Sequence, residues 1–136
     1  MAQMKLNIVT PEGSVYDDQA KMITVRTIDG DRGIMPHHEP LITGVDIGPI
    51  KIKEDSDELH LAASHGYMEV TPEEVTILVD TAEFADEIDV ERAEEAKKRA
   101  EDRLNKGNDN INERRAEIAL QKAINRLRVT KGRNFE

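Results

Sequence analysis

The most constraining feature of this chain is a change of sequence period near Asp86. Before it, apolar and polar residues alternate, as in Lys5-Leu6-Asn7-Ile8, which is typical of strands with one buried face. After it, apolar residues recur every three or four positions and no proline follows, which is typical of helices. The 136 residues therefore divide into a β body, residues 1–85, and a helical segment, residues 86–136.

Alternation and turn residues predict five extended stretches in the β body. Clusters such as Pro11-Glu12-Gly13 separate them at regular intervals, which favours a sandwich or a flattened barrel. Proline cannot donate a hydrogen bond to a strand ladder, so Pro36, Pro40 and Pro49 are expected at strand ends, edges or loops. The expected strands are 3–10, 14–27, 41–53, 58–70 and 75–81.

Two helices are expected after the change of period. The first carries a narrow and mostly alanine stripe, and Gly107 then permits a left-handed stop before a second helix from Asn110. The short connection predicts an antiparallel hairpin, so the fold class is α+β, a β-sandwich followed by two helices. Alanine faces bury little apolar area, and the hairpin is therefore expected to open readily. The apolar positions are Ala93, Ala96, Ala100 and Leu104, then Ala116, Ala119, Leu120, Ala123, Ile124 and Leu127.

Composition excludes several classes of protein. The net charge of −9 argues against nucleic-acid binding, and the absence of cysteine excludes disulfides and thiolate chemistry. No apolar run is long enough to span a bilayer and no signal peptide is apparent, so we expect a cytoplasmic chain without direct membrane insertion. Residues 110–136 carry seven basic and three acidic side chains, a balance suited to an acidic protein partner, although an ordinary solvated helix explains the same balance.

No catalytic or metal-binding constellation is found in the sequence. His37 and His38 are adjacent and point to opposite faces of an extended chain, and no serine has a recognisable base. The remaining polar set is Asp89, Arg92 and Arg99 on one face of the first helix, with Arg126 on the second. Guanidinium groups suit phosphate oxygens, although ordinary surface ion pairs explain the same spacing.

Four segments, taken in order, resemble landmarks of the epsilon subunit family of bacterial F-type ATP synthase. They are Leu6 to Gly13, Gly33 to Leu41, His65 to Val70 and Ile88 to Ala93. The resemblance covers essentially the whole chain. It implies a non-catalytic rotor subunit at the cytoplasmic face of the cell membrane, peripheral through the complex, which couples proton flow to ATP synthesis.

The same resemblance implies the partners and the regulatory role. The β-sandwich would bind the gamma subunit and the membrane ring of c subunits. The helices would be compact in the permissive state, in which ATP hydrolysis is not inhibited. When extended, they would reach the alpha/beta catalytic head and inhibit ATP hydrolysis. Two alternatives remain open at this point: a free-standing nucleotide-sensing regulatory protein, and a small β-barrel binding protein with an incidental helical tail.

The resemblance also implies a regulatory ligand, ATP, with no other cofactor. Family members from bacilli bind ATP on the closed hairpin through a motif that is intact here as Ile88-Asp89-Val90-Glu91-Arg92-Ala93. Lys122 stands where the family often has arginine; lysine keeps the charge but lacks the planar fork, so weaker binding is expected. The further residues implied for the site are Glu83, Arg99 and Arg126.

Overall fold

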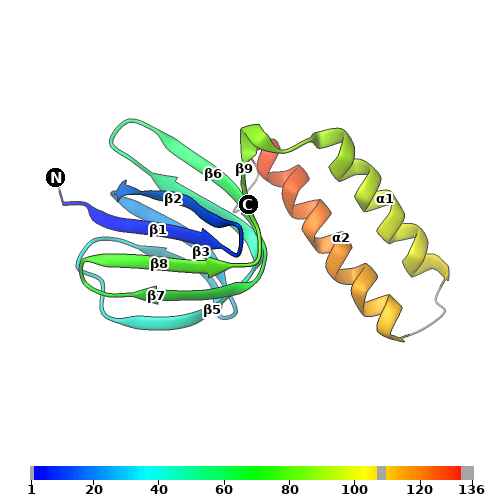
Figure 1. Cartoon of the computed structure of the whole chain (residues 1–136), viewed down its shortest axis with the longest axis horizontal. Coiled ribbons are helices and arrows are strands. Elements are labelled where there is room, and N and C mark those ends of the chain that lie inside the picture. The colour runs from blue at the N-terminus through cyan, green and yellow to red at the C-terminus, as the bar shows by residue number, and fades with distance from the viewer. Residues whose placement is uncertain (1, 107–109, 133–136) are drawn as a thin grey trace.

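The computed structural model describes residues 2–106 and 110–132, which form a β body with two helices beside it (Figure 1). A short 3-10 helix, η1 (Ala85–Glu87), connects the two parts. The helices are α1 (Val90–Lys106) and α2 (Asn110–Thr130). The strands are β1 (Met4–Thr10), β2 (Gly13–Ala20), β3 (Met22–Thr27), β4 (Gly30–Ile34), β5 (Leu41–Lys53), β6 (Glu58–Ala63), β7 (Gly66–Val70), β8 (Glu74–Val79) and β9 (Ala82–Phe84).

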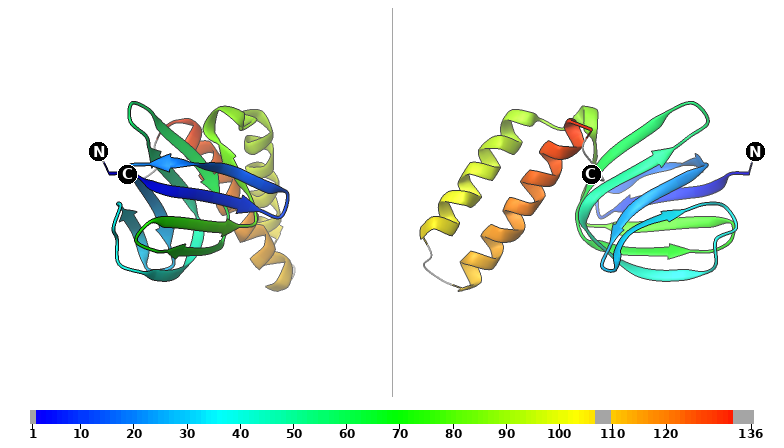
Figure 2. Two further views of the ribbon diagram at one scale, coloured as in Figure 1. Left: turned by 60° about the vertical axis from the view of Figure 1, so that its left-hand side comes forward. Right: turned by 180° about the vertical axis from the view of Figure 1, so that it is seen from behind.

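The long strand β5 joins the two layers of the β body. Its first part, from Leu41 to Val45, pairs with β7, and its last part, from Gly48 to Lys53, pairs with β6. The strand order runs β2-β1-β8-β7-β5-β3-β4, and β6 and β9 extend from β5. The resulting sandwich is visible from two sides in Figure 2 and confirms the predicted α+β class.

The core of the sandwich is built entirely from strand residues. Alternate positions of each strand point inward, and Leu6, Ile8, Ile50 and Ile77 are fully buried. The cluster of buried core residues runs from Met4 to Val79 and includes no helical residue. The β body therefore has its own core and does not depend on the helices for burial.

Two predicted strands are wrong in their extent. The expected strand 14–27 is interrupted at Lys21, and the expected strand 58–70 is interrupted at Ser64 and His65, because the chain moves to a new pairing partner at each point. Neither interruption contains a glycine or proline. The expected strands also leave out β4 and the three-residue β9.

Pro49 lies inside β5, which contradicts its predicted place at a strand end or edge. It faces Ala62 of β6, and on the other side the pairing with β3 skips from Ile50 to Val45. This irregularity removes the need for a donor at Pro49, since the strand bends there and the regular ladder is interrupted.

The helical hairpin is antiparallel, as predicted (Figure 1), and alanines are buried on both helices. Ala93 and Ala100 are the buried residues of α1, and Ala116 and Ala123 are buried on α2. The cross-helix pairs Ala93 with Ala123 and Ala100 with Ala116 are each centred on position 108, so small residues are placed at matching levels of the two helices. The predicted stop at Gly107 falls outside the described residues. No helix among the described residues is long and apolar enough to cross a membrane.

Helix α2 is the one that rests on the β body. It packs against β5, β6 and η1 on one side and against α1 on the other. Val129 of α2 is buried with Ala62 of β6 and Ile88 of the connection. In Figure 1, α1 is the outer helix. The hairpin is therefore closed, with α2 between α1 and the sandwich.

Candidate functional site

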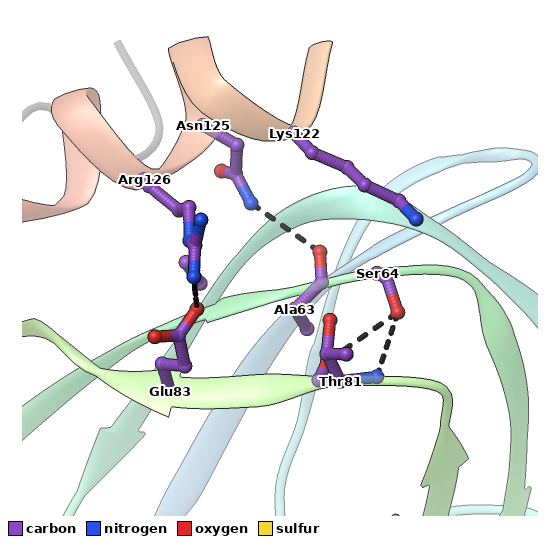
Figure 3. A pocket seen from close by; sticks show the side chains of 8 residues that line it. Ala63, Ser64, Thr81, Glu83, Lys122, Asn125 and Arg126 are labelled. Carbon is purple, nitrogen blue, oxygen red and sulfur yellow. Dashed lines mark hydrogen bonds and ion pairs between the residues drawn. The ribbon is translucent and has the colours of Figure 1, made fainter. Parts of the chain in front are cut away.

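A pocket of about 160 Å³ lies where α2 meets the edge of the sandwich. Strands β6 and β9 supply its floor, and one face of α2 supplies the other wall (Figure 3). The pocket is thus formed only while the hairpin is closed. Its lining residues are Ala62, Ala63, Ser64, Thr81, Glu83, Lys122, Asn125 and Arg126.

Glu83 and Arg126 form an ion pair across this contact. The Arg126 Nη2 and Nε atoms lie 2.6 and 2.7 Å from the same carboxylate oxygen, Oε1 of Glu83. Both side chains remain about one third exposed, at 38% and 32% respectively. Because both bonds go to one oxygen, the second carboxylate oxygen and the remaining guanidinium N–H groups can still engage a ligand.

Lys122 lies one helical turn before Arg126 and extends over the same pocket in Figure 3. It forms no ion pair with any described residue of the chain. Two cations and one carboxylate leave a positive balance at the pocket, which suits an anionic ligand such as a phosphate group.

Asn125 anchors the helical wall of the pocket. Its side chain is 8% exposed, and its Nδ2 donates hydrogen bonds to the carbonyl oxygens of Gly48, at 2.9 Å, and Ala63, at 3.3 Å. On the strand side, the Thr81 N–H donates to Ser64 Oγ at 2.8 Å, which joins the β8–β9 turn to the β6–β7 turn. The walls are therefore held in place by hydrogen bonds from both elements.

The motif at the start of α1 has a structural role in the closed hairpin. Asp89 Oδ1 accepts a hydrogen bond from the Arg92 backbone N–H at 3.2 Å, which makes Asp89 the N-cap of α1. Ile88 is buried against Val129, and Ala93 is buried at the helix contact.

The structure brings only part of the predicted site together. Glu83, Lys122 and Arg126 share the pocket, whereas the side chains of Arg92 and Arg99 are exposed and line no part of it. An anion held by Lys122 and Arg126 would therefore need a further movement of α1 to meet Arg92. Among the described residues there is also no group of three or more histidine and acidic side chains that would hold a metal ion.

Sequence reasoning missed several lining residues. The sequence offers one weak signal for Asn125, which is a polar residue directly after apolar Ile124 and two residues before apolar Leu127. The helix that carries it is buried on two faces. Ser64 and Thr81 gave no signal in the sequence. Their contact joins two turns that only the strand pairing brings together.

Two family models match consecutive parts of the chain. The model described as ATP synthase, Delta/Epsilon chain, beta-sandwich domain matches residues 3–85. The model described as ATP synthase, Delta/Epsilon chain, long alpha-helix domain matches residues 86–131. The boundary between the two models falls at η1, where the strand pairing ends.

Curated relatives resemble the chain over nearly its whole length. The ATP synthase epsilon chain of Bacillus velezensis is 52% identical over 129 residues, which cover 95% of this chain and 98% of the relative. The ATP synthase epsilon chain of Halalkalibacterium halodurans is 44% identical over 130 residues, with coverage of 95% and 98%. Both matched segments are long enough to include strands and helices.

Solved structures share the fold at lower sequence identity. A chain of the Euglena gracilis mitochondrial ATP synthase, solved as an OSCP/F1/c-ring assembly, matches with a TM-score of 0.80 and 23% identity, covering 89% of this chain and 77% of that chain. A chain from the central stalk and c-ring of the Tetrahymena thermophila mitochondrial ATP synthase matches with a TM-score of 0.65 and 16% identity, covering 95% and 97%. These matches support the arrangement of sandwich and helices.

Proposed function

The chain belongs to the ATP synthase delta/epsilon family, and from this premise we propose that it couples proton flow to ATP synthesis as part of the rotor and regulates ATP hydrolysis through its helices. Epsilon chains are non-catalytic subunits, so the active sites lie on other subunits of the complex. The alternative of a free-standing nucleotide sensor receives no support from the comparisons.

The β-sandwich is the part that binds the rotor in this proposal. Its core is complete without the helices, so it can stay attached to the gamma subunit and the ring of c subunits while the hairpin moves. The chain is then peripheral at the cytoplasmic face of the cell membrane, held there through the complex. No described helix is long and apolar enough to cross a membrane.

The hairpin is the regulatory part, and the pocket between α2 and the sandwich carries the proposal. A ligand that binds Lys122 and Arg126 together with the strand side of the pocket stabilises the closed hairpin, because the site is lost when α2 leaves. ATP supplies the required phosphate oxygens. High ATP therefore favours the closed, permissive state.

The open hairpin is the inhibitory state in this proposal. The exposed cations of α2, which include Arg114, Arg115 and Arg128, lie outside the pocket and are available to an acidic segment of the alpha/beta catalytic head. Few buried residues hold α2 on the sandwich, so opening is expected without unfolding of the β body.

Calorimetry with ATP on the isolated chain tests the nucleotide site. Arg126→Ala is expected to abolish measurable binding, because Arg126 contributes to the pocket and to its ion pair with Glu83. Arg92→Ala tests whether α1 moves so that Arg92 contacts the nucleotide. A weaker effect on ATP binding is expected, because the Arg92 side chain is exposed. Equal heats for the unmodified chain and both variants would reject the site.

A further inference from the structure

Asn125 is the buried polar side chain through which α2 contacts two strands at once. Gly48 on β5 and Ala63 on β6 are register partners at the end of one ladder. The single Nδ2 group of Asn125 donates to both oxygens, at 2.9 and 3.3 Å. One amide group therefore binds the helix to the layer that forms the pocket floor.

The chemistry of this contact requires a donor with two hydrogens. Both acceptors are carbonyl oxygens, so a carboxylate would repel them and an apolar side chain would leave them without this partner. Asparagine is also a poor helix former compared with leucine or alanine. Its presence inside α2 is therefore explained by the contact with the strands and not by helix formation.

Asn125 also sits between the two cations of the pocket. Lys122 precedes it by nearly one helical turn and Arg126 follows it directly, and all three side chains line the pocket. Fixing Asn125 on the strands fixes the height and rotation of this turn of α2. The distance of both cations from Glu83 then depends on the Asn125 hydrogen bonds.

We propose that Asn125 is the positioning residue that docks α2 on β5 and β6, sets the population of the closed hairpin, and holds Lys122 and Arg126 at the pocket. The docking part is independent of any ligand. The part that concerns ligand affinity rests on the proposed ATP site.

The test compares hairpin docking in Asn125→Leu and Asn112→Leu. Asn112 is an exposed asparagine on the same helix, so it provides the same substitution without the strand contact. The chain has no cysteine, so Ser56→Cys on the β5–β6 turn and Asp102→Cys on α1 accept a fluorescent donor and acceptor cleanly. Energy transfer in the full chain without nucleotide then reports the docked and undocked populations.

In Asn125→Leu we expect the ratio of docked to undocked chain to fall about tenfold, equivalent to about 1.4 kcal/mol. Asn112→Leu is expected to leave the ratio unchanged. Leucine is more apolar and a better helix former, so packing alone would instead make docking tighter. Asn125→Ala, which removes the amide without added bulk, is expected to change the ratio in the same direction. Docking as in the unmodified chain, or tighter, in both Asn125 variants would overturn the proposal.

An ATP titration of the same labelled chains tests the positioning part. The apparent dissociation constant for ATP is expected to rise about threefold or more in Asn125→Leu and not in Asn112→Leu. An unchanged affinity despite weaker docking would overturn the positioning of the two cations. If the unmodified chain binds no ATP, the proposed nucleotide site fails, whereas the docking comparison still stands on the measurement without nucleotide.

Discussion

Lys122 and Arg126 line the same pocket but offer a ligand different hydrogen-bond geometry. Arginine presents a planar fork that matches two phosphate oxygens, whereas lysine acts as a point charge. We therefore expect Lys122→Arg to tighten ATP binding about fivefold to tenfold in calorimetry. Lys131→Arg, an exposed change at the end of the same helix, is the control. Equal affinities for Lys122→Arg and the unmodified chain would show that position 122 does not touch the phosphates.

Tyr16 holds the β2 layer to the turn after β5. Its hydroxyl donates a hydrogen bond of 2.6 Å to Glu54 Oε2, and its ring is buried. Tyr16→Phe is expected to lower the free energy of unfolding by about 1–2 kcal/mol, because Glu54 loses its donor. Tyr67→Phe is the matched control, since Tyr67 is 68% exposed. Thermal unfolding of Tyr16→Phe and Tyr67→Phe at neutral pH shows whether the loss of stability is specific to Tyr16.

The environment of Tyr16 also predicts that the protein loses stability at alkaline pH. Burial, followed by the hydrogen bond and the charge of Glu54, raises the pKa of Tyr16 well above its ordinary value. The unfolded chain releases this proton first, so the contribution of Tyr16 to stability is complete below pH about 10 and declines as pH rises further. Urea unfolding from pH 8 to 11 should show a shallower decline for Tyr16→Phe than for Tyr67→Phe. Identical declines would contradict this assignment.

At the scale of residues, the sequence prediction includes the three charged residues that line the pocket but not the residue that anchors its helical wall. Glu83, Lys122 and Arg126 were predicted through the family resemblance, and the closed hairpin places all three at one pocket. Asn125 was missed because its partners, Gly48 and Ala63, are distant in sequence and act through backbone carbonyls. Carbonyl groups carry no sequence signature, so a contact of this kind requires the fold.

At the scale of elements, prediction succeeded where one period persists. The second helix begins at Asn110 as expected, since its apolar positions repeat every three or four residues, and β5 spans the expected residues 41–53. The corners at Lys21 and Ser64 were missed because neither contains a glycine or proline and only the change of strand partner marks them. Strand pairing is a non-local property, which a local pattern does not report.

The separation of the two cores predicts which part folds alone. Residues 1–85 are expected to unfold cooperatively with a midpoint within a few degrees of the full chain, because the sandwich core contains no helical residue. A chain that ends at residue 106 keeps α1 without α2 and should lose its helical signal, since α1 packs on α2 and a lone helix of this length is marginal. Circular dichroism of both chains tests this prediction. A helical 1–106 chain would mean that α1 binds the sandwich directly.

At the scale of the whole molecule, the chain is a rigid β body with a weakly held helical hairpin. The contact between them combines the Asn125 hydrogen bonds, the Glu83–Arg126 ion pair and the small apolar cluster of Ala62 with Val129. Helix α2 contributes no residue to the sandwich core, so the hairpin can leave without loss of the fold. A ligand at this contact changes only the population of the closed state.

The most direct test is ATP hydrolysis by a reconstituted alpha/beta/gamma head with a chain whose hairpin can be locked. Ala62→Cys with Val129→Cys places a disulfide at the apolar contact between β6 and α2. The reduced chain is expected to inhibit hydrolysis at low ATP and to release the head at high ATP. The oxidised chain should not inhibit at any ATP concentration, with the single-cysteine chains as controls. Inhibition by the oxidised chain equal to that by the reduced chain would contradict regulation through opening of the hairpin.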